Sequence, residues 1–329
     1  MIGTLFSVFV LLLLLVTAVA IVQTANLFVA SMLAGIFSLL LATTFFLLDA
    51  ADVALTEAAV GAGISTVLFL SALALTSETE RTPARWSGLA LAVVATAAAV
   101  LIYATFDKPA FGDPEAPVHT HVAPWYISQT AAEVDIPNIV TAVLASFRAY
   151  DTLGEVFVVL TAGIGVLFLL SARRGIAYRD DIARRDGEGL RHYVIPRVVG
   201  RLLIPFILIF GLYVQFHGEY GPGGAFQAGA IIAAGFILLA LLEGEERALQ
   251  AVPLQALLYL SAGGALLYGG VGVASVLLGG NFLEYRVFLP GPAASQQLGI
   301  IAIELGVGLT VTGVLLSIFH AFAARGRGL

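Results

Sequence analysis

Residues 202–242 read "LLIPFILIFGLYV", "QFHGEYGPGGAFQAG" and "AIIAAGFILLALL", so a short polar segment at 215–229 separates two apolar runs. The polar segment contains His217, Glu219, Tyr220, Pro222 and five glycines. Glycine and proline interrupt helices and favour turns. The stretch therefore predicts two apolar helices joined by a tight hairpin, and it raises the question of why the turn carries ionisable groups.

The rest of the chain is equally apolar. Of its 329 residues, 59% are hydrophobic and 12% are charged, and the mean hydropathy is +0.97. A soluble domain carries about twice that share of charge. Several runs reach the roughly 20 apolar residues that cross a bilayer. We predict an all-α polytopic membrane helix bundle with nine spans at about 2–22, 27–48, 53–76, 86–106, 153–171, 202–215, 225–242, 254–278 and 299–322. A tenth, interfacial or re-entrant helix is predicted at 137–150.

Composition also excludes several kinds of chemistry. The chain has no cysteine, which rules out thiolate catalysis, cysteine-bound zinc and iron–sulfur clusters. The five histidines have no paired ligand spacing, and no phosphate-binding glycine loop is present. The net charge is −6, and Lys108 is the only lysine, which argues against binding of nucleic acid. We expect no enzymatic activity, no cofactor and no fixed metal.

Arginine clusters predict how the chain lies in the membrane. The loop 172–197 is rich in arginine and is predicted to be cytoplasmic. Counting spans from this loop places Arg81, Arg85, Arg325 and Arg327 on the same side. The prediction is therefore a multi-pass protein of the plasma (inner) membrane with its N-terminus outside and its C-terminus inside. The first run is expected to remain as an uncleaved helix.

Two acidic residues lie near the start of the third predicted span. Asp52 is either the N-cap of that helix or part of an ion path. Glu57 lies about a turn and a half inside the span, too deep to be a cap, so an ion path is the stronger reading. A carboxylate in lipid costs roughly 2.5–3.5 kcal/mol unless it faces protein or water.

A second charged group precedes the fifth predicted span. Arg148, Asp151 and Glu155 are spaced i, i+3 and i+7 and would share one face of a continuous helix. Thr152 and Glu155 also match a capping box, in which Thr152 would be the N-cap. In that structural interpretation Arg148 neutralises Asp151. Ion handling is the alternative, and the two are compatible.

The remaining candidates lie in the second half of the chain. His217 ends an apolar span, where a histidine is either a structural residue or a pH-sensitive group. Glu219 and Tyr220 are expected to be solvated. Glu304 lies inside the ninth span without a positive partner there, as a protonated or hydrogen-bonded carboxyl or as a proton relay. The glycines of 261–280 are expected to serve helix packing only.

Two of these segments resemble known families. "DVALTEAAVGAGISTVLF" and "NIVTAVLASFRAYDTLGEVFVVLTAGIGV" resemble the part of Mrp-type cation/proton antiporters and membrane-bound hydrogenases that is similar to the J subunit of complex I. "PFILIFGLYVQFHGEYGPGGAFQAGAIIAAGFIL" resembles the B-type (MnhB/MrpB) subunit of the same antiporters. The predicted domains are a J-like three-helix part at 1–80, its continuation at 81–172, an arginine-rich linker at 173–199 and a MnhB-like four-helix domain at 200–329.

The resemblance implies an accessory subunit of a multisubunit Na+/H+ antiporter. The implied partners are large A- and D-type subunits and small C-, E-, F- and G-type subunits, besides lipid, Na+ and H+. The resemblance implies that His217, Pro222 and Phe226 lie at an assembly surface, and Glu219 of the same turn is a further assembly candidate. The ion-path candidates are Asp52, Glu57, Arg148, Asp151, Glu155 and Glu304, with transient Na+ binding near Glu57 and Asp151. The alternatives are the equivalent subunit of an energy-converting hydrogenase or oxidoreductase, and a stand-alone transporter. The family's large subunits carry buried lysines, and their absence from the predicted spans disfavours the last.

Overall fold

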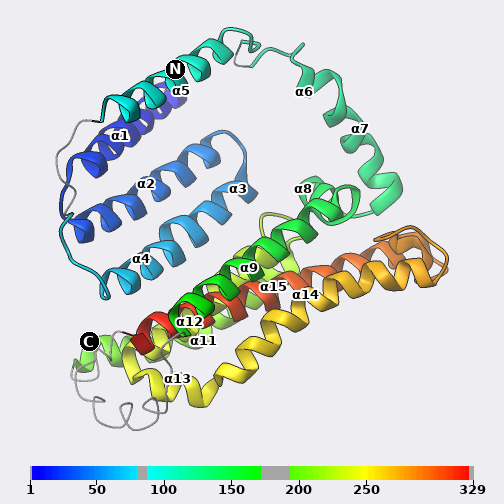
Figure 1. Cartoon of the computed structure of the whole chain (residues 1–329). Helices are drawn as coiled ribbons and strands as arrows, with labels where there is room; N and C mark the ends of the chain where they lie inside the picture. The colour runs from blue at the N-terminus through cyan, green and yellow to red at the C-terminus, as the bar shows by residue number, and fades with distance from the viewer. Residues whose placement is uncertain (1, 81–86, 111, 172–192, 326–329) are drawn as a thin grey trace.

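The computed structural model describes residues 2–80, 87–110, 112–171 and 193–325 as a bundle of helices (Figure 1). No β-strand occurs in these ranges. The α-helices are α1 (Ile2–Gln23), α2 (Leu27–Leu47), α3 (Ala51–Thr56), α4 (Thr66–Leu73), α5 (Gly88–Thr105), α6 (Pro117–Thr120), α7 (Val122–Gln129), α8 (Ile139–Ala142), α9 (Ala149–Ser171), α11 (Val194–His217), α12 (Ala225–Glu243), α13 (Glu245–Ala251), α14 (Leu254–Leu277) and α15 (Pro292–Arg325). The π-helices are η1 (Glu57–Ser65), η2 (Thr130–Val134) and η3 (Val143–Phe147), and η5 (Tyr285–Val287) is a 3-10 helix.

Within the described ranges, nine helices are long and apolar enough to cross a membrane. Because α3, η1 and α4 run on without a break, they count as one of these spans, Ala51–Leu73. The predicted all-α polytopic fold is confirmed. In Figure 1, α1–α4 form one group, and α9, α11, α12, α14 and α15 form a second. α15 is the centre of the second group because it packs against α9, α12 and α14.

Glycines bring α14 and α15 into backbone contact. A Cβ atom on Gly306 of α15 would lie 2.6 Å from the carbonyl oxygen of Gly264 on α14. Small residues allow this close approach of membrane helices. By contrast, a Cβ atom on Gly263, Gly269 or Gly270 would meet nothing within 4 Å. Only some of the glycines in 261–280 therefore contribute to helix packing within the chain.

The third span changes its winding in the middle. It is α-helical up to Thr56 and π-helical over the nine residues of η1, starting at Glu57. Gly61 and Gly63 lie in this wide segment. A Cβ atom on Gly61 would lie 2.9 Å from Ser38 Oγ of α2 and 2.9 Å from Cδ of Glu57, so both side chains pack at this glycine. π-helical segments are rare and are frequent at functional sites.

Three helices begin earlier than the apolar runs predicted. α9 begins at Ala149 instead of residue 153, α11 at Val194 instead of 202, and α15 at Pro292 instead of 299. In α11 the extra turns carry Arg197 and Arg201, and both donate to the buried carboxylate of Glu243 at the end of α12. Because Glu243 neutralises these charges, α11 can begin before the point at which hydropathy alone predicts its start.

The segment 137–150 is not one helix. It contains α8 and η3 and then breaks at Arg148, whose φ is −125° and ψ is 31°. Buried tyrosine hydroxyls bind the carbonyls around this break, because Tyr268 donates to Ala149 O at 2.7 Å and Tyr285 to Ala145 O at 2.9 Å. The predicted loop 107–137 also contains α6, α7 and η2, which are too short for a hydropathy pattern to reveal.

The residues that predicted the orientation lie mostly outside the described ranges. They are Arg81, Arg85, Arg327 and most of the arginine-rich loop, 172–192. The orientation and the four-part domain division therefore stay predictions.

Candidate functional site

The polar turn between α11 and α12 is a compact structure held from both sides. Gly224 N–H donates to Val214 O at 3.1 Å, which closes the hairpin. Gly224 has φ +138°, a conformation that favours glycine, and it is followed directly by the first residue of α12. Pro222 precedes these glycines. The predicted hairpin is therefore present.

Residues of the first half of the chain bind this turn. The Asn138 side chain donates to Gly218 O at 2.9 Å and to Gly221 O at 3.0 Å, and its backbone N–H donates to Glu219 O at 3.0 Å. The buried Thr141 hydroxyl also donates to Gly218 O, at 2.6 Å. Asn138 is at the same time the N-cap of α8. The start of α8 and the turn therefore form one hydrogen-bonded unit.

The third span contacts the same turn. The Asp52 carboxylate accepts from Asn138 Nδ2 at 3.2 Å and from Gly223 N at 3.4 Å. One turn later, Thr56 Oγ1 accepts from the side chain of Gln227 on α12 at 2.6 Å. Asp52 is not an N-cap, since Ala50 occupies that position and makes no side-chain cap bond. Its carboxylate faces Gly223, 171 residues further along the chain, instead of its own helix end.

A cavity of about 630 Å³ lies where these elements meet; we call it the junction cavity. Its lining residues are Asp52, Val53, Thr56, Val140, Thr141, Leu144, Ala145, Thr152, Glu155, Val158, Val159, Gly223, Gly224, Ala225, Phe226, Gln227, Ile303, Glu304 and Val307. They come from α3, α8, η3 and α9 in the first half of the sequence and from the turn, α12 and α15 in the second half. Both halves of the chain thus line the cavity.

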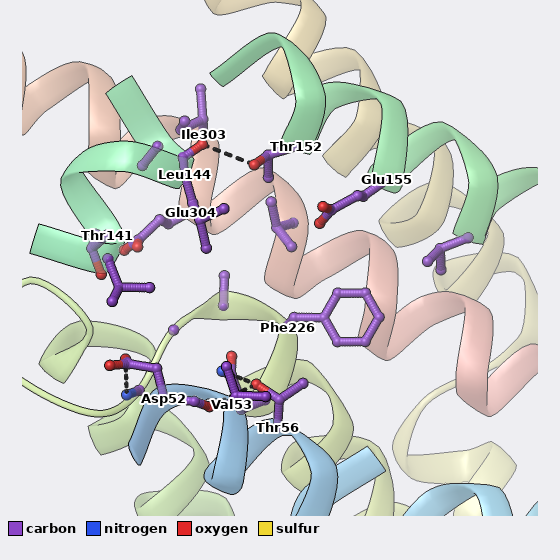
Figure 2. A pocket seen from close by; sticks show the side chains of 18 of the residues that line it. Asp52, Val53, Thr56, Thr141, Leu144, Thr152, Glu155, Phe226, Ile303 and Glu304 are labelled. Carbon is purple, nitrogen blue, oxygen red and sulfur yellow. Dashed lines mark hydrogen bonds between the residues drawn. The ribbon is translucent and has the colours of Figure 1, made fainter. Parts of the chain in front are cut away.

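Three carboxyl groups, several hydroxyls and the Gln227 amide interrupt an otherwise apolar lining. In Figure 2, Asp52 and Thr56 lie on one side of the cavity, opposite Glu155 of α9 and Glu304 of α15. Among the described lining residues none is basic. The structure therefore brings together Asp52, Glu155, Glu304 and Phe226, which the sequence had predicted as separate features.

Glu304 also lines a second cavity, of about 200 Å³, which we call the turn cavity. Its lining residues are Gln215, Phe216, Glu219, Tyr220, Ile301 and Glu304. Glu219 is not solvated as predicted: it is 7% exposed, and its Oε1 has no hydrogen-bond partner among the described residues. Burial raises the pKa of the Glu219 carboxyl above its ordinary value. The Tyr220 side chain, by contrast, is 64% exposed.

The raised pKa of Glu219 gives an expected pH dependence of stability. Below the ordinary pKa of 4.5, Glu219 is protonated in both the folded and the unfolded chain. As pH rises through the higher folded pKa, the folded state must hold a buried charge, so the stabilising difference is lost. Glu219→Gln cannot ionise. Between about pH 4 and about pH 8, we expect the melting temperature of the wild type to fall relative to that of the variant. Parallel curves would contradict this.

The other predicted residues lie outside both cavities. Glu57 is half-buried beside Gly61. Arg148 and Asp151 form the predicted ion pair, but in this chain their side chains are 58% and 48% exposed. The His217 ring stacks on Tyr213 of its own helix, with ring centroids 4.7 Å apart.

The predicted capping box is wrong. Because α9 begins at Ala149, Thr152 lies inside the helix and does not cap it. Its hydroxyl donates instead to Leu144 O at 2.8 Å, across the break before α9 (Figure 2). Glu155 is therefore not a capping partner, and its carboxyl faces the junction cavity.

Sequence reasoning missed Asn138, Thr141 and Gln227. The sequence does indicate the capping role of Asn138, because an asparagine before an apolar run is a typical N-cap. It does not indicate the contacts of Asn138 with the turn, since these join residues 80 or more positions apart. Among the residues that the structure describes, no group of three or more His, Cys, Asp or Glu side chains is placed to hold a metal ion.

Comparison with known proteins matches three successive segments of the chain to three different family models. Residues 12–78 match the MbhD family model, for the D-type subunit of MBH, and residues 83–185 match the MbhE family model, for its E-type subunit. Residues 195–317 match the "Domain related to MnhB subunit of Na+/H+ antiporter". The junction cavity is therefore lined both by the parts that match the MBH-type models and by the part that matches the antiporter-type model.

Two relatives extend the comparison. A putative antiporter subunit mnhB2 of Staphylococcus haemolyticus is 32% identical over 133 residues, which are 40% of this chain and 94% of that protein. A probable K(+)/H(+) antiporter A/B subunit of Rhizobium meliloti is 28% identical over 312 residues. That match covers 85% of this chain but only 30% of the larger relative.

Two solved structures have a similar fold. The Mrp complex of Dietzia sp. DQ12-45-1b matches 95% of this chain with a TM-score of 0.72 and 26% identity, and the chain spans 34% of that protein. One chain of the archaeal membrane-bound sulfane sulfur reductase matches with a TM-score of 0.51 and 27% identity. The match covers 70% of this chain and 97% of that chain.

Fold and site together define a polytopic membrane protein that joins MBH-type and antiporter-type parts around a carboxyl-lined cavity. The chain is homologous to subunits of Mrp/Mnh-type antiporters. It belongs to the family related to the MnhB subunit of Na+/H+ antiporters.

Proposed function

We propose that the chain is an accessory membrane subunit of a multisubunit cation/proton antiporter and that the junction cavity forms part of its ion path. The observation that carries this proposal is the convergence of Asp52, Glu155 and Glu304 on one cavity without a basic residue among the lining residues. Ionisable groups inside membrane spans are costly, and they typically mark ion or proton paths. The relatives from Staphylococcus and Rhizobium are named as antiporter subunits, which supports the same interpretation.

The ion transport is proposed to require partner subunits. Lys108 is the only lysine of the chain, and it follows α5 instead of lying in a span. A buried lysine changes its pKa readily, so the lysine-bearing pump module is expected in the large A- and D-type subunits. Small C-, E-, F- and G-type subunits complete the proposed assembly in the plasma membrane. The N-terminus would be outside and the C-terminus in the cytoplasm, and the chain itself would catalyse no reaction.

Glu57 is proposed as a further position on the path. It begins the π-helical segment η1, where the widened helix packs against Ser38 of α2. Transient Na+ or K+ binding is proposed near Glu57 and near Asp151, whose exposed side chain suits an entrance. Arg148 would balance the charge of Asp151 there.

A second candidate function is the equivalent subunit of a redox-driven membrane complex. The similarity to the sulfane sulfur reductase and the two MBH family matches favour it. In that case the chain would contribute the same ion path, and other subunits would carry out the redox chemistry. Co-purification of redox subunits would favour this candidate over the antiporter.

The experiment is transport by the purified complex in liposomes, read as cation-driven proton movement. Glu155→Gln keeps the shape of the side chain but can neither carry a charge nor release a proton. We expect this variant to lower the exchange rate at least about tenfold with an unchanged subunit content. Glu115→Gln is the matched control because Glu115 is an exposed residue away from both cavities, and it should behave as wild type.

Two results would count against the proposal. Full exchange by the isolated chain would remove the accessory role. A wild-type rate in the Glu155→Gln complex would remove the junction cavity from the ion path.

A further inference from the structure

The turn cavity places a buried acid next to the ion-path candidate Glu304. Glu219 lies in the turn after α11, and Glu304 lies on α15. Both line the same cavity of about 200 Å³, which is large enough for ordered water. The turn backbone also lies close by, since a Cβ atom on Gly218 would be 3.5 Å from Glu304 Oε1.

One carboxyl oxygen of Glu219 is buried without a hydrogen-bond partner among the described residues. The residue is 7% exposed, and the unpartnered atom is its Oε1. A buried polar atom is normally paired with protein or ordered water. Burial also raises the pKa of this carboxyl, so the site favours its protonated form. The hydrogen bonds of Asn138 to the turn hold the residue in this position.

Glu304 is the residue that the two cavities share. It lines the junction cavity together with Asp52 and Glu155, and it lines the turn cavity together with Glu219 and Tyr220. Tyr220 and Phe216 are 64% and 56% exposed, so the turn cavity reaches the surface of the chain. Glu304 is therefore the connection between the junction cavity and that surface.

We propose that Glu219 and Glu304 form a proton-exchanging carboxyl pair that connects the junction cavity to the surface beside Tyr220. This inference rests on the proposed transport function. In the exchange step, the O–H bond of one carboxyl breaks as an O–H bond forms on the other carboxylate, directly or through one water. The pair holds one proton before and after the step, so its charge stays at −1.

The surroundings favour a proton over a metal cation as the transferred ion. No basic residue is among the described residues that line either cavity. Two carboxylates that share a site cannot both ionise readily, so one proton is retained. The other titratable groups around the pair are Tyr220 in the turn, Tyr268 on α14, and Asp52 and Glu155 across the junction cavity. His217, at the end of α11, stacks on Tyr213.

The test is proton movement by the reconstituted complex carrying Glu219→Gln, Glu304→Gln or both. We expect each single variant to lower proton movement at least about tenfold and the double variant to be no slower than the slower single variant. Infrared spectroscopy should show a protonated carboxyl band in the wild type, and Glu219→Gln should shift or remove this band. Glu246→Gln, an exposed acid on α13, is the control and should match wild type in both measurements.

The outcomes separate this inference from the proposed function. If Glu155→Gln stops exchange but both pair variants transport as wild type, the pair is wrong and the antiporter function stands. If the wild-type complex shows no exchange, the function itself is wrong. Additive losses in the double variant, or an unchanged infrared band in Glu219→Gln, would overturn the pair.

A more conservative variant tests the pair if the Gln variants fail to assemble. Glu304→Asp keeps an ionisable carboxyl but moves it back by one methylene. The pair requires slower exchange and a shifted pH profile in this variant, with a normal subunit content. A wild-type pH profile would contradict the inference.

Discussion

Replacing Gly264 with alanine is expected to separate α14 from α15 and to abolish recovery of the assembled protein. The added Cβ would lie 2.8 Å from the backbone nitrogen of Thr310 and would also collide with the carbonyl oxygen of Gly306. Both obstacles are backbone atoms, so no side-chain rotation relieves them. Overpacking of this kind costs about 1–3 kcal/mol or more. Since α15 also packs against α9 and α12, its displacement would disturb both cavities.

The neighbouring residue provides the matched control. A Cβ atom on Gly263 would meet nothing within 4 Å, so Gly263→Ala should keep wild-type stability. The measurements are the yield and the melting temperature of the protein in detergent. Equal yields for the two variants would show that the close contact of α14 with α15 does not limit the stability of the bundle.

The second large effect is expected for Asn138→Ala. The change removes the N-cap of α8 and leaves Gly221 O without its side-chain donor. Loss of a cap costs about 1 kcal/mol, and each lost hydrogen bond to the turn costs about 0.5–1.5 kcal/mol more. We expect at least about 2 kcal/mol of destabilisation and a loss of transport, because the turn that positions Glu219 is released.

Two variants identify the cause of the Asn138 effect. Asn138→Asp keeps an oxygen that can cap α8 but loses the donors to the turn and places a second carboxylate next to Asp52. It should therefore retain α8 and still lose transport. Asn281→Ala removes an asparagine whose side chain donates to the nearby Glu284, and it should have little effect. Full transport by Asn138→Asp would show that the cap alone matters.

The number of spans and the fold class were predictable from the sequence because hydropathy is a local property. A run of about 20 apolar residues identifies a span without knowledge of its neighbours. The predicted starts of the helices were less accurate. The first turns of α11 carry Arg197 and Arg201, and only the distant Glu243 explains why these charges lie within a helix.

The site was predictable as a set of residue types but not as an arrangement. Asp52, Glu155 and Glu304 were noticeable because each is an acid in an apolar region. Their convergence depends on how α3, α9 and α15 pack, which one sequence does not record. Glu219 was misread as solvated because turn residues are usually exposed, whereas Gln215, Ile301 and Glu304 enclose this one.

The turn between α11 and α12 is bound by α3 and α8 of the same polypeptide, and this has a consequence for biogenesis. Translation delivers the two sides of the junction in equal copy number and at the same place in the membrane. Linked binding partners meet at a high effective concentration, so each hydrogen bond between them can be individually weak. In a chain carrying only residues 195–317, the same contacts would depend on encounter in the lipid and on matched expression. We therefore expect severing the polypeptide between α9 and α11 to make transport depend on the relative dose of the two fragments.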